Sequence, residues 1–399
     1  MRPRKHLIVL GTVLLALAGA GAAAAGWSRS SAGSGDARAV SMPAGSTPTA
    51  AIGTYPNLTV SWAGVTVSGA AVSSYTIRRY SEAGVLQAIT AGCNGAIAAT
   101  TCTENSVPAG RWQYTSQPVK GVWSGAESSR SATHEIAAPP TTVTCSNCTT
   151  FGSTSYINNA GKLSVNIQVA LPASSLVTDT VHLTLADGAS HTVTAATQSA
   201  ADGAGTLTFS GLNTSTFVDG NVTATAWVTT NTSESSPNTT ATLVRDTVAP
   251  TATNINGTSG STPGSMDAAD TLVYTFSEPM VPASIRSGWD GTAVVVTSTL
   301  APGTLNDTIT VAGSSLGTVN TRVDYVLIAA ATCSSTLVYT GNAATLTIGS
   351  CTFGIGGSFA VLVGSSTFDW APSTAATDRA GNPMTSTTAS ESGGPKANF

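Results

Sequence analysis

Residues 163–171 read LSVNIQVAL, and this stretch decides the fold of the chain. Apolar side chains stand at every second position, at Leu163, Val165, Ile167, Val169 and Leu171. Such alternation is typical of a half-buried β-strand, because successive side chains of a strand point to opposite faces. One face of this strand is therefore expected to pack into a core, and the other to face solvent.

The same period recurs elsewhere in the chain. Residues 58–62 read LTVSW and residues 272–276 read LVYTF. Turn residues separate these short runs at the spacing of β-sandwich proteins. The pattern predicts an all-β protein built of tandem immunoglobulin-like β-sandwiches, which follow an N-terminal apolar helix.

Composition narrows the class of protein. The chain has 399 residues, of which 41% are hydrophobic and 9% charged, and its net charge is -4. Disordered proteins combine low hydrophobicity with high net charge, so this chain is expected to bury cores. Nucleic-acid binding needs clustered Lys and Arg to neutralise phosphates, and the sequence has no such cluster beyond its N-terminus. No nucleic-acid partner is therefore predicted.

The N-terminus carries a signal for export. Arg2, Arg4 and Lys5 precede residues 7–27, which contain no charged residue. This order is typical of a secretory signal peptide, and A-x-A-like cleavage choices fall at residues 22–24 and 23–25. An uncleaved membrane anchor is the alternative, since about 20 apolar residues span a bilayer. The rest of the chain is expected outside the cell or at its surface, with the membrane as a partner only if this segment is uncleaved.

Changes in composition predict where the domains begin and end. Residues 28–48 are rich in Ser, Gly, Ala and Pro, which is typical of a flexible linker. Residues 138–140 read APP and residues 246–250 read DTVAP, and both are predicted boundaries. The predicted order is a signal peptide or anchor over 1–27, a linker over 28–48, and sandwiches over 49–138, 141–247 and 248–399, the last with a polar C-terminal tail.

The first predicted sandwich resembles a fibronectin type III domain. Residues 58–62 resemble the family's B strand with its core tryptophan, and residues 75–80, YTIRRY, resemble its C strand. Residues 107–114, VPAGRWQY, resemble the corner between strands E and F, with Trp112 at the usual place of a tyrosine. An indole N–H can donate a hydrogen bond but cannot reproduce that of a phenol. The resemblance implies a sandwich that serves as an adhesive unit or a spacer.

The last predicted sandwich resembles bacterial immunoglobulin-like domains of surface-layer and adhesin proteins. The matching stretches are DTVAP at 246–250, LVYTFSEPM at 272–280, SGWDG at 287–291 and DRAGNPM at 378–384. This resemblance implies a surface domain without common catalytic residues. Residues 141–247 show only the general sandwich pattern.

The six cysteines form three pairs of near neighbours. Each pair falls within one predicted sandwich, and cysteines of exported proteins are usually oxidised. Local disulfides are therefore predicted between Cys93 and Cys102, Cys145 and Cys148, and Cys333 and Cys351. A redox role for the C-x-x-C pair would need a helix N-terminus to lower a thiol pKa, and none is predicted there. Zinc would need a second pair of ligands with matching spacing.

No catalytic residue is predicted. Residues 313–317 read GSSLG and match the G-x-S-x-G elbow, in which a strand, a turn and a helix expose the serine. The segment that follows, around Tyr325, has a strand pattern instead. An abundance of Gly and Ser makes a chance match at Ser315 the expected explanation.

Metal ligands are equally sparse, and no cofactor is predicted. His182 and His191 flank a predicted hairpin turn at Asp187–Gly188. A two-residue Asp-Gly turn would pair residues 182 with 193 and 184 with 191, which would place both histidines on one face as possible metal ligands. A three-residue loop with Gly188 left-handed instead pairs Val181 with Val193 and matches the apolar faces, so this register is predicted, and it sends the two histidines to opposite faces. Calcium binding is left open, because loop oxygens can hold Ca²⁺ although no EF-hand spacing occurs; the loop residues concerned are Asp267, Asp270, Asp378 and Asn382.

Two tryptophans are candidates for ligand contact. Trp289 and Trp123 are flanked by turn residues, and an exposed indole can stack on a sugar ring. The alternative is that each ring folds back as a plug at the end of its sandwich.

Together these observations predict a non-enzymatic, exported, structural or adhesive surface protein whose partner is an unknown surface protein or glycan. An extracellular glycan-binding module is the alternative.

Overall fold

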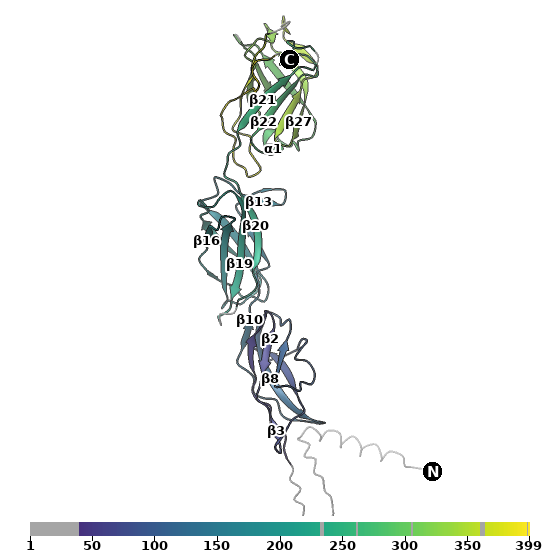
Figure 1. Ribbon diagram of the computed structural model, residues 1–399, viewed down its shortest axis with the longest axis vertical. Coiled ribbons are helices and arrows are strands. Elements are labelled where there is room, and N and C mark those ends of the chain that lie inside the picture. Colours follow the sequence, from purple (N-terminus) through teal and green to yellow (C-terminus); the bar gives the residue numbers. More distant parts are fainter. Residues whose placement is uncertain (1–39, 232–234, 261, 305, 360–363, 397) are drawn as a thin grey trace, which may run out of the picture. The chain divides into compact units, whose positions relative to one another are not determined.

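The computed structural model describes residues 40–231, 235–260, 262–304, 306–359, 364–396 and 398–399. The predicted signal peptide or apolar helix, and the linker up to residue 39, lie outside these residues. Contacts divide the chain into two compact units, residues 1–136 and 137–399. Regular structure in the described part is almost entirely strand (Figure 1), which confirms the predicted all-β class. No described helix has the length and apolarity needed to span a bilayer.

The first unit is a sandwich of two sheets. One sheet has the order β1 (Thr49–Ile52), β2 (Leu58–Ser61), β7 (Thr101–Glu104). The other has the order β10 (His134–Ile136), β8 (Gly110–Lys120), β5 (Ser74–Ser81), β6 (Leu86–Gln87), with β9 (Trp123–Ser124) on β8. A small hairpin joins β3 (Thr66–Val67) to β4 (Ala70–Ala71). Leu58, Val60 and Trp62 lie in the core, as their alternation predicts.

Trp112, in the stretch that resembles the corner between strands E and F, makes a hydrogen bond to the backbone. Its indole N–H donates to the backbone carbonyl of Pro108 at 2.7 Å. A phenol in this corner also donates to the backbone a few residues upstream. Trp112 thus donates to the backbone upstream of it, while the resemblance of residues 107–114 to a fibronectin corner stays a prediction.

The second unit contains two hydrophobic cores. We call residues 137–247 the second sandwich and residues 248–399 the third sandwich. In the second sandwich one sheet has the order β11 (Thr142–Cys145), β14 (Val165–Leu171), β18 (Gly205–Leu212). The other has the order β12 (Thr149–Phe151), β13 (Thr154–Ile157), β20 (Thr239–Arg245), β19 (Gly220–Thr229), β15 (Thr180–Asp187), β16 (Thr192–Thr194), with β17 (Gln198–Ser199) on β15.

Strand β14 covers seven of the nine residues of the LSVNIQVAL stretch. Val165, Ile167, Val169 and Leu171 are all buried, and the residues between them are partly exposed. Leu163 precedes the strand and is 59% exposed. The alternation thus predicted the strand and its buried face, but placed its start two residues too early.

The third sandwich is one hydrogen-bonded path of strands that curls around its core. The order is β21 (Ala252–Thr258), β22 (Thr271–Phe276), β28 (Ala343–Thr347), β27 (Ala331–Thr340), β23 (Val294–Ala301), β24 (Thr308–Val311), β25 (Thr318–Asn320), β31 (Asp369–Ala371), β32 (Ala389–Ser390), with β29 (Cys351–Phe353) on β27. A separate pair joins β26 (Val326–Leu327) to β30 (Ser358–Phe359). Helix α1 (Pro282–Ile285) is a single turn. The curl brings the two ends of the path together, since Ser392 N donates to the Asn254 side chain at 2.9 Å.

The β15–β16 hairpin has a three-residue loop, but the predicted register was wrong. Val193 pairs with Leu185 rather than with Val181, and Ser190, with φ 70°, takes the left-handed position instead of Gly188. His182 stacks on Trp227 with ring centroids 4.9 Å apart. His191 instead contacts Asp187, with 2.8 Å between the ring nitrogen and the carboxylate.

Asp187 organises this loop, and its side chain is fully buried. Burial opposes ionisation, but backbone N–H groups of Val218, His191 and Ala189 and the His191 ring donate to the carboxylate. These bonds hold the pKa of Asp187 well below its ordinary value of 3.8. A carboxyl group with a lowered pKa stabilises the fold above its unfolded pKa, and this contribution is lost as pH falls through the folded pKa.

We therefore expect Asp187→Asn to lower the midpoint of urea unfolding at neutral pH, because the amide cannot replace the charged acceptor. The difference from wild type should shrink in acid below pH 3.8, where the wild-type carboxyl begins to take up its proton in the unfolded chain. Urea titrations of wild type and variant, at neutral pH and below pH 3.8, measure this difference in the unfolding midpoint. A difference that does not change with pH would contradict the assignment.

Candidate functional site

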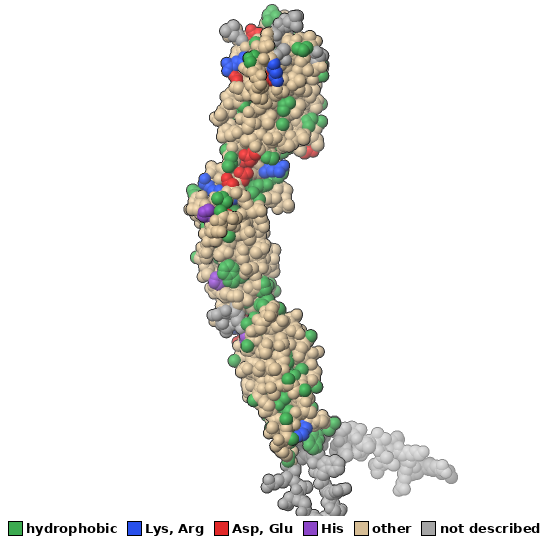
Figure 2. Space-filling model, viewed as in Figure 1, with side chains coloured by type: hydrophobic (Ala, Val, Ile, Leu, Met, Phe, Trp, Pro, Cys, Tyr) green, Lys and Arg blue, Asp and Glu red, His purple; other side chains and the backbone are tan. Residues whose placement is uncertain are grey.

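Three carboxylates meet at one end of the third sandwich. Asp246 directly follows β20, and Glu278 comes just after β22. Asp378 lies in the segment between β31 and β32. Each offers one oxygen, and these oxygens lie within 4.8 Å of one another. We call these three residues the acidic cluster. Figure 2 shows acidic side chains gathered in one place on the viewed face of the second unit, although most of that surface is uncharged.

Backbone contacts position the cluster. Met280, two residues after Glu278, forms an isolated β-bridge with Asp378. Asn382 donates through its backbone N–H at 2.8 Å and its side-chain amide at 2.9 Å to the two carboxylate oxygens of Asp378. The same amide donates to the backbone carbonyl of Asp246 at 2.9 Å. The DTVAP, SEPM and DRAGN stretches therefore converge on one site.

The cluster concentrates negative charge where solvent is partly excluded. Burial, followed by the charges of Asp246, Asp378 and Asp219, raises the pKa of Glu278 to about 7. Burial and then the charge of Asp378 also raise the pKa of Asp246. The neighbouring Arg245 pairs with Asp219 at 2.5 Å, and within the described residues no ion pair reaches the three clustered carboxylates.

The arrangement resembles a set of hard oxygen ligands. Ca²⁺ takes six to eight oxygens from carboxylates, carbonyls, amides and water, so the acidic cluster could supply three of them. Of the loop residues that the sequence offered as calcium ligands, Asp378 and Asn382 lie at the acidic cluster. Asp267 and Asp270 belong to a different turn, in which Asp270 accepts from the N–H groups of Gly260 at 2.7 Å and Asp267 at 2.6 Å.

The raised pKa of Glu278 makes a pH-dependent prediction. Between its ordinary value of 4.5 and about 7, folded Glu278 keeps a proton that the unfolded chain has released. Stability therefore falls as pH rises through this window. Glu278→Gln removes this pH-dependent loss of stability, because glutamine does not ionise. The variant should therefore melt at a higher temperature than wild type at pH above 7, and at about the same temperature below pH 4.5.

Calorimetry on the full chain measures this effect, with a chelator present because a bound divalent cation would neutralise the cluster. Glu82→Gln is the matched control, because Glu82 lies in the first unit and its side chain is 54% exposed. An equal gain for Glu278→Gln on both sides of the window would rule out charge repulsion as its cause.

A cavity of about 480 Å³ lies beside the cluster. Its lining includes Phe151, Trp289, Tyr339 and Arg379, and the guanidinium of Arg379 lies 5.1 Å from the centre of the Phe151 ring. Trp289 is 6% exposed, and its indole N–H donates to the Thr292 carbonyl at 2.6 Å. Stacking of a sugar on Trp289 would require the ring to leave this packing.

Trp123 lies in a different setting. It is 56% exposed in the β8–β9 hairpin of the first unit, next to Val122, which is 97% exposed. Its indole face is therefore accessible to a ligand in a way that the face of Trp289 is not. Ligand contact at either tryptophan stays a prediction.

The three predicted disulfides are confirmed, and no cysteine is free. Cys145 ends β11 and Cys148 comes just before β12, so strands flank this C-x-x-C pair on both sides. No helix N-terminus is available there to lower a thiol pKa. This arrangement fits a structural disulfide.

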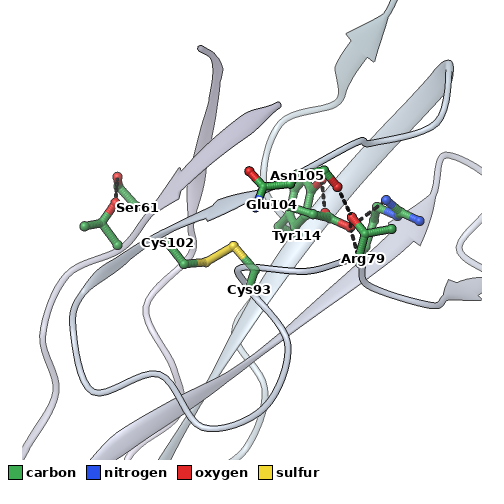
Figure 3. The surroundings of a disulfide bond; sticks show 9 residues. Ser61, Arg79, Cys93, Cys102, Glu104, Asn105 and Tyr114 are labelled. Carbon is green, nitrogen blue, oxygen red and sulfur yellow. Dashed lines mark hydrogen bonds and ion pairs between the residues drawn. A yellow bond between two sulfur atoms is a disulfide. The ribbon is translucent and has the colours of Figure 1, made fainter. Parts of the chain in front are cut away.

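A buried ion pair lies beside the Cys93–Cys102 disulfide (Figure 3). Arg79 Nη1 is 2.7 Å from Glu104 Oε1, and the two side chains are 4% and 0% exposed. The Tyr114 hydroxyl donates to the other carboxylate oxygen at 2.7 Å, and the Thr90 N–H donates to Oε1 at 2.8 Å. Arg79 also lies 4.6 Å from the centre of the Trp112 ring. The Glu104 carboxylate is thus held by Arg79, Tyr114 and Thr90 at once, which fits a structural role.

Ser315 lies between two strands rather than before a helix. Strand β24 precedes it and β25 follows it, and its backbone N–H donates to the carbonyl of Ile285 at 2.6 Å. The strand–turn–helix geometry of a nucleophile elbow is therefore missing from this described segment.

Comparisons with known proteins add little beyond this geometry. No protein-family profile matches the chain, and no curated protein matches its sequence. Among solved structures, the crystal structure of the chicken CNTN1 FN1–FN3 domains is similar, with 8% sequence identity and a TM-score of 0.25. The match covers 81% of this chain and 99% of that one. A likeness at this level carries no argument about function, and the two family resemblances stay predictions.

Proposed function

We propose that this chain is an exported, non-enzymatic protein that has a structural or adhesive role at the cell surface. The observation that carries the proposal is the tandem of sandwiches, in which each of three cores has its own disulfide. Disulfides persist in oxidising compartments outside the cytosol. The basic and apolar N-terminal sequence supports the same location.

The test is to fractionate cells that express the full chain. Mass spectrometry then identifies the N-terminal residue of the chain and shows which cysteines a thiol reagent has labelled. An exported chain should start near Gly26 or keep its N-terminus in the membrane fraction, and its six cysteines should label only after reduction. A chain found in the cytosol with Met1 retained and six free thiols would overturn the proposal. Robust turnover in a panel of hydrolase assays, abolished by one substitution, would overturn its non-enzymatic part.

Glycan binding is the second candidate, and the 56% exposure of Trp123 favours it. On this hypothesis Trp123→Ala weakens retention on an insoluble polysaccharide, because stacking of the indole on a sugar ring is lost, and leaves the melting temperature unchanged. Retention and calorimetry of the full chain measure both effects. Equal retention of variant and wild type would remove the candidate.

A further inference from the structure

Two loops at one end of the third sandwich expose large apolar side chains. The first follows β26 and contains Ile328, which is 82% exposed. The second joins β29 to β30 and contains Ile355, which is fully exposed. Leu327 and Phe353, at the starts of the two loops, are 45% and 36% exposed. We call these four residues the apolar tip.

Strand pairing holds the two loops side by side. Leu327 pairs with Ser358 across β26 and β30, and Ala331 pairs with Phe353 across β27 and β29. The Cys333–Cys351 disulfide joins the same two strands next to the tip. Gly354 N donates across the loops to the Ala330 carbonyl at 3.2 Å. The tip is therefore one braced projection rather than two independent loops.

Ile328 combines an unfavourable backbone conformation with an exposed side chain. Its φ is 69°, a conformation that β-branched residues rarely adopt. A tight turn surrounds it, in which Ala329 N donates to the Leu327 carbonyl at 2.8 Å. Glycine would take this conformation without strain. An isoleucine held there by its surroundings points to a use for the side chain.

The chemistry of the tip selects among partners. The four side chains of the apolar tip are uncharged, and no charged residue occurs between Asp324 and Asp369 in the sequence. Stable protein interfaces need about 20–30 residues on each side, far more than four side chains. A bilayer requires neither charge nor a complementary shape. Backbone N–H groups of Ala329, Gly354 and Gly357 are bonded within the loops, which leaves fewer polar groups to lose water when the apolar side chains enter the bilayer surface.

We propose that the apolar tip inserts into the surface of a lipid bilayer, with Ile328 and Ile355 as the inserting side chains. This inference goes beyond the proposed surface role and does not depend on where the chain resides. The contact is apolar, so it needs no anionic lipid and persists at high salt.

The test uses fluorescence that reports from the tip itself. The full chain carrying Ile355→Trp is mixed with vesicles of phosphatidylcholine whose acyl chains are brominated, because bromine quenches a tryptophan that enters the bilayer. The emission of the tryptophan at position 355 is the difference between the spectra of variant and wild type. This emission should be quenched equally at low and high salt. Val295→Trp is the matched control, since Val295 is 69% exposed on β23, away from the tip.

A second substitution tests the strained residue. Ile328→Gly in the Ile355→Trp chain should weaken vesicle binding of the tip about tenfold, because one inserting side chain is lost. The melting temperature should not fall, because glycine accepts the backbone conformation. Unquenched emission at residue 355, equal quenching at residue 295, or loss of quenching in high salt would each overturn the proposal.

Discussion

Replacing Glu104 with Gln should destabilise the first unit by about 3–5 kcal/mol, because the substitution leaves the Arg79 guanidinium buried without its counter-charge. Both side chains are almost wholly removed from solvent, so water cannot compensate for the lost partner. Gln keeps the size of the side chain, which confines the change to charge and hydrogen bonding. Hydrogen exchange of peptides from β5 and β8 in the full chain measures the loss.

Two controls separate the buried charge from other effects. Glu82→Gln removes an exposed partner of Arg111 in the same unit, where 54% of the Glu82 side chain is accessible, and should cost less than about 1 kcal/mol. The double variant Arg79→Met with Glu104→Gln should cost less than the sum of the two single substitutions, because no unpaired charge remains. Additive costs would show that the pair does not act as a unit.

Replacing Trp370 with Ala should destabilise the third sandwich by about 3–5 kcal/mol, since the change opens a large cavity in a closely packed core. Trp370 has no exposed area. Its ring lies edge-on to Tyr274, with centroids 5.1 Å apart, and to Phe276, with centroids 5.2 Å apart. Its indole N–H donates to the Leu316 carbonyl, which would lose its partner.

Calorimetry of the full chain should show one transition moved to lower temperature by Trp370→Ala. Trp123→Ala is the matched control, because the same atoms are removed from a ring that is 56% exposed, and it should change stability by less than about 0.5 kcal/mol. Similar shifts for both variants would mean that Trp370 does not hold the core together.

Local periodicity predicted the strands well, because burial on one face imposes a period of two on the sequence. It did not fix where β14 begins, since Leu163 continues the apolar pattern but lies in the turn before the strand. It also did not fix the register of β15 and β16. The predicted register paired Val193 with Val181, whereas Val193 pairs with Leu185 in the structure. Both partners are apolar residues of the same buried face, so the apolar pattern fits either register.

The sequence carries a signal for the buried ion pair. Tyr75, Ile77 and Arg79 stand at alternate positions of one strand, so the same buried face that carries the first two also carries the arginine. Cys102 and Glu104 have this relation in β7. A charged residue on an apolar face needs a buried partner of opposite charge, and each of these two strands supplies one.

The acidic cluster could not be assembled from the sequence in the same way. Asp246, Glu278 and Asp378 lie far apart in the chain, in the DTVAP, LVYTFSEPM and DRAGNPM stretches. Their meeting depends on the bridge between Met280 and Asp378 and on the reach of the Asn382 side chain. These are tertiary contacts, which no local pattern encodes.

The cysteine pairs are separated by 9, 3 and 18 positions along the chain. A thiol finds a nearby partner sooner than a distant one, because closing a short loop costs less chain entropy. On the proposed export of the chain, N-terminus first, each pair would emerge almost together and oxidise before the next pair appears. We therefore expect oxidative maturation of this chain to be vectorial and to depend little on a disulfide isomerase.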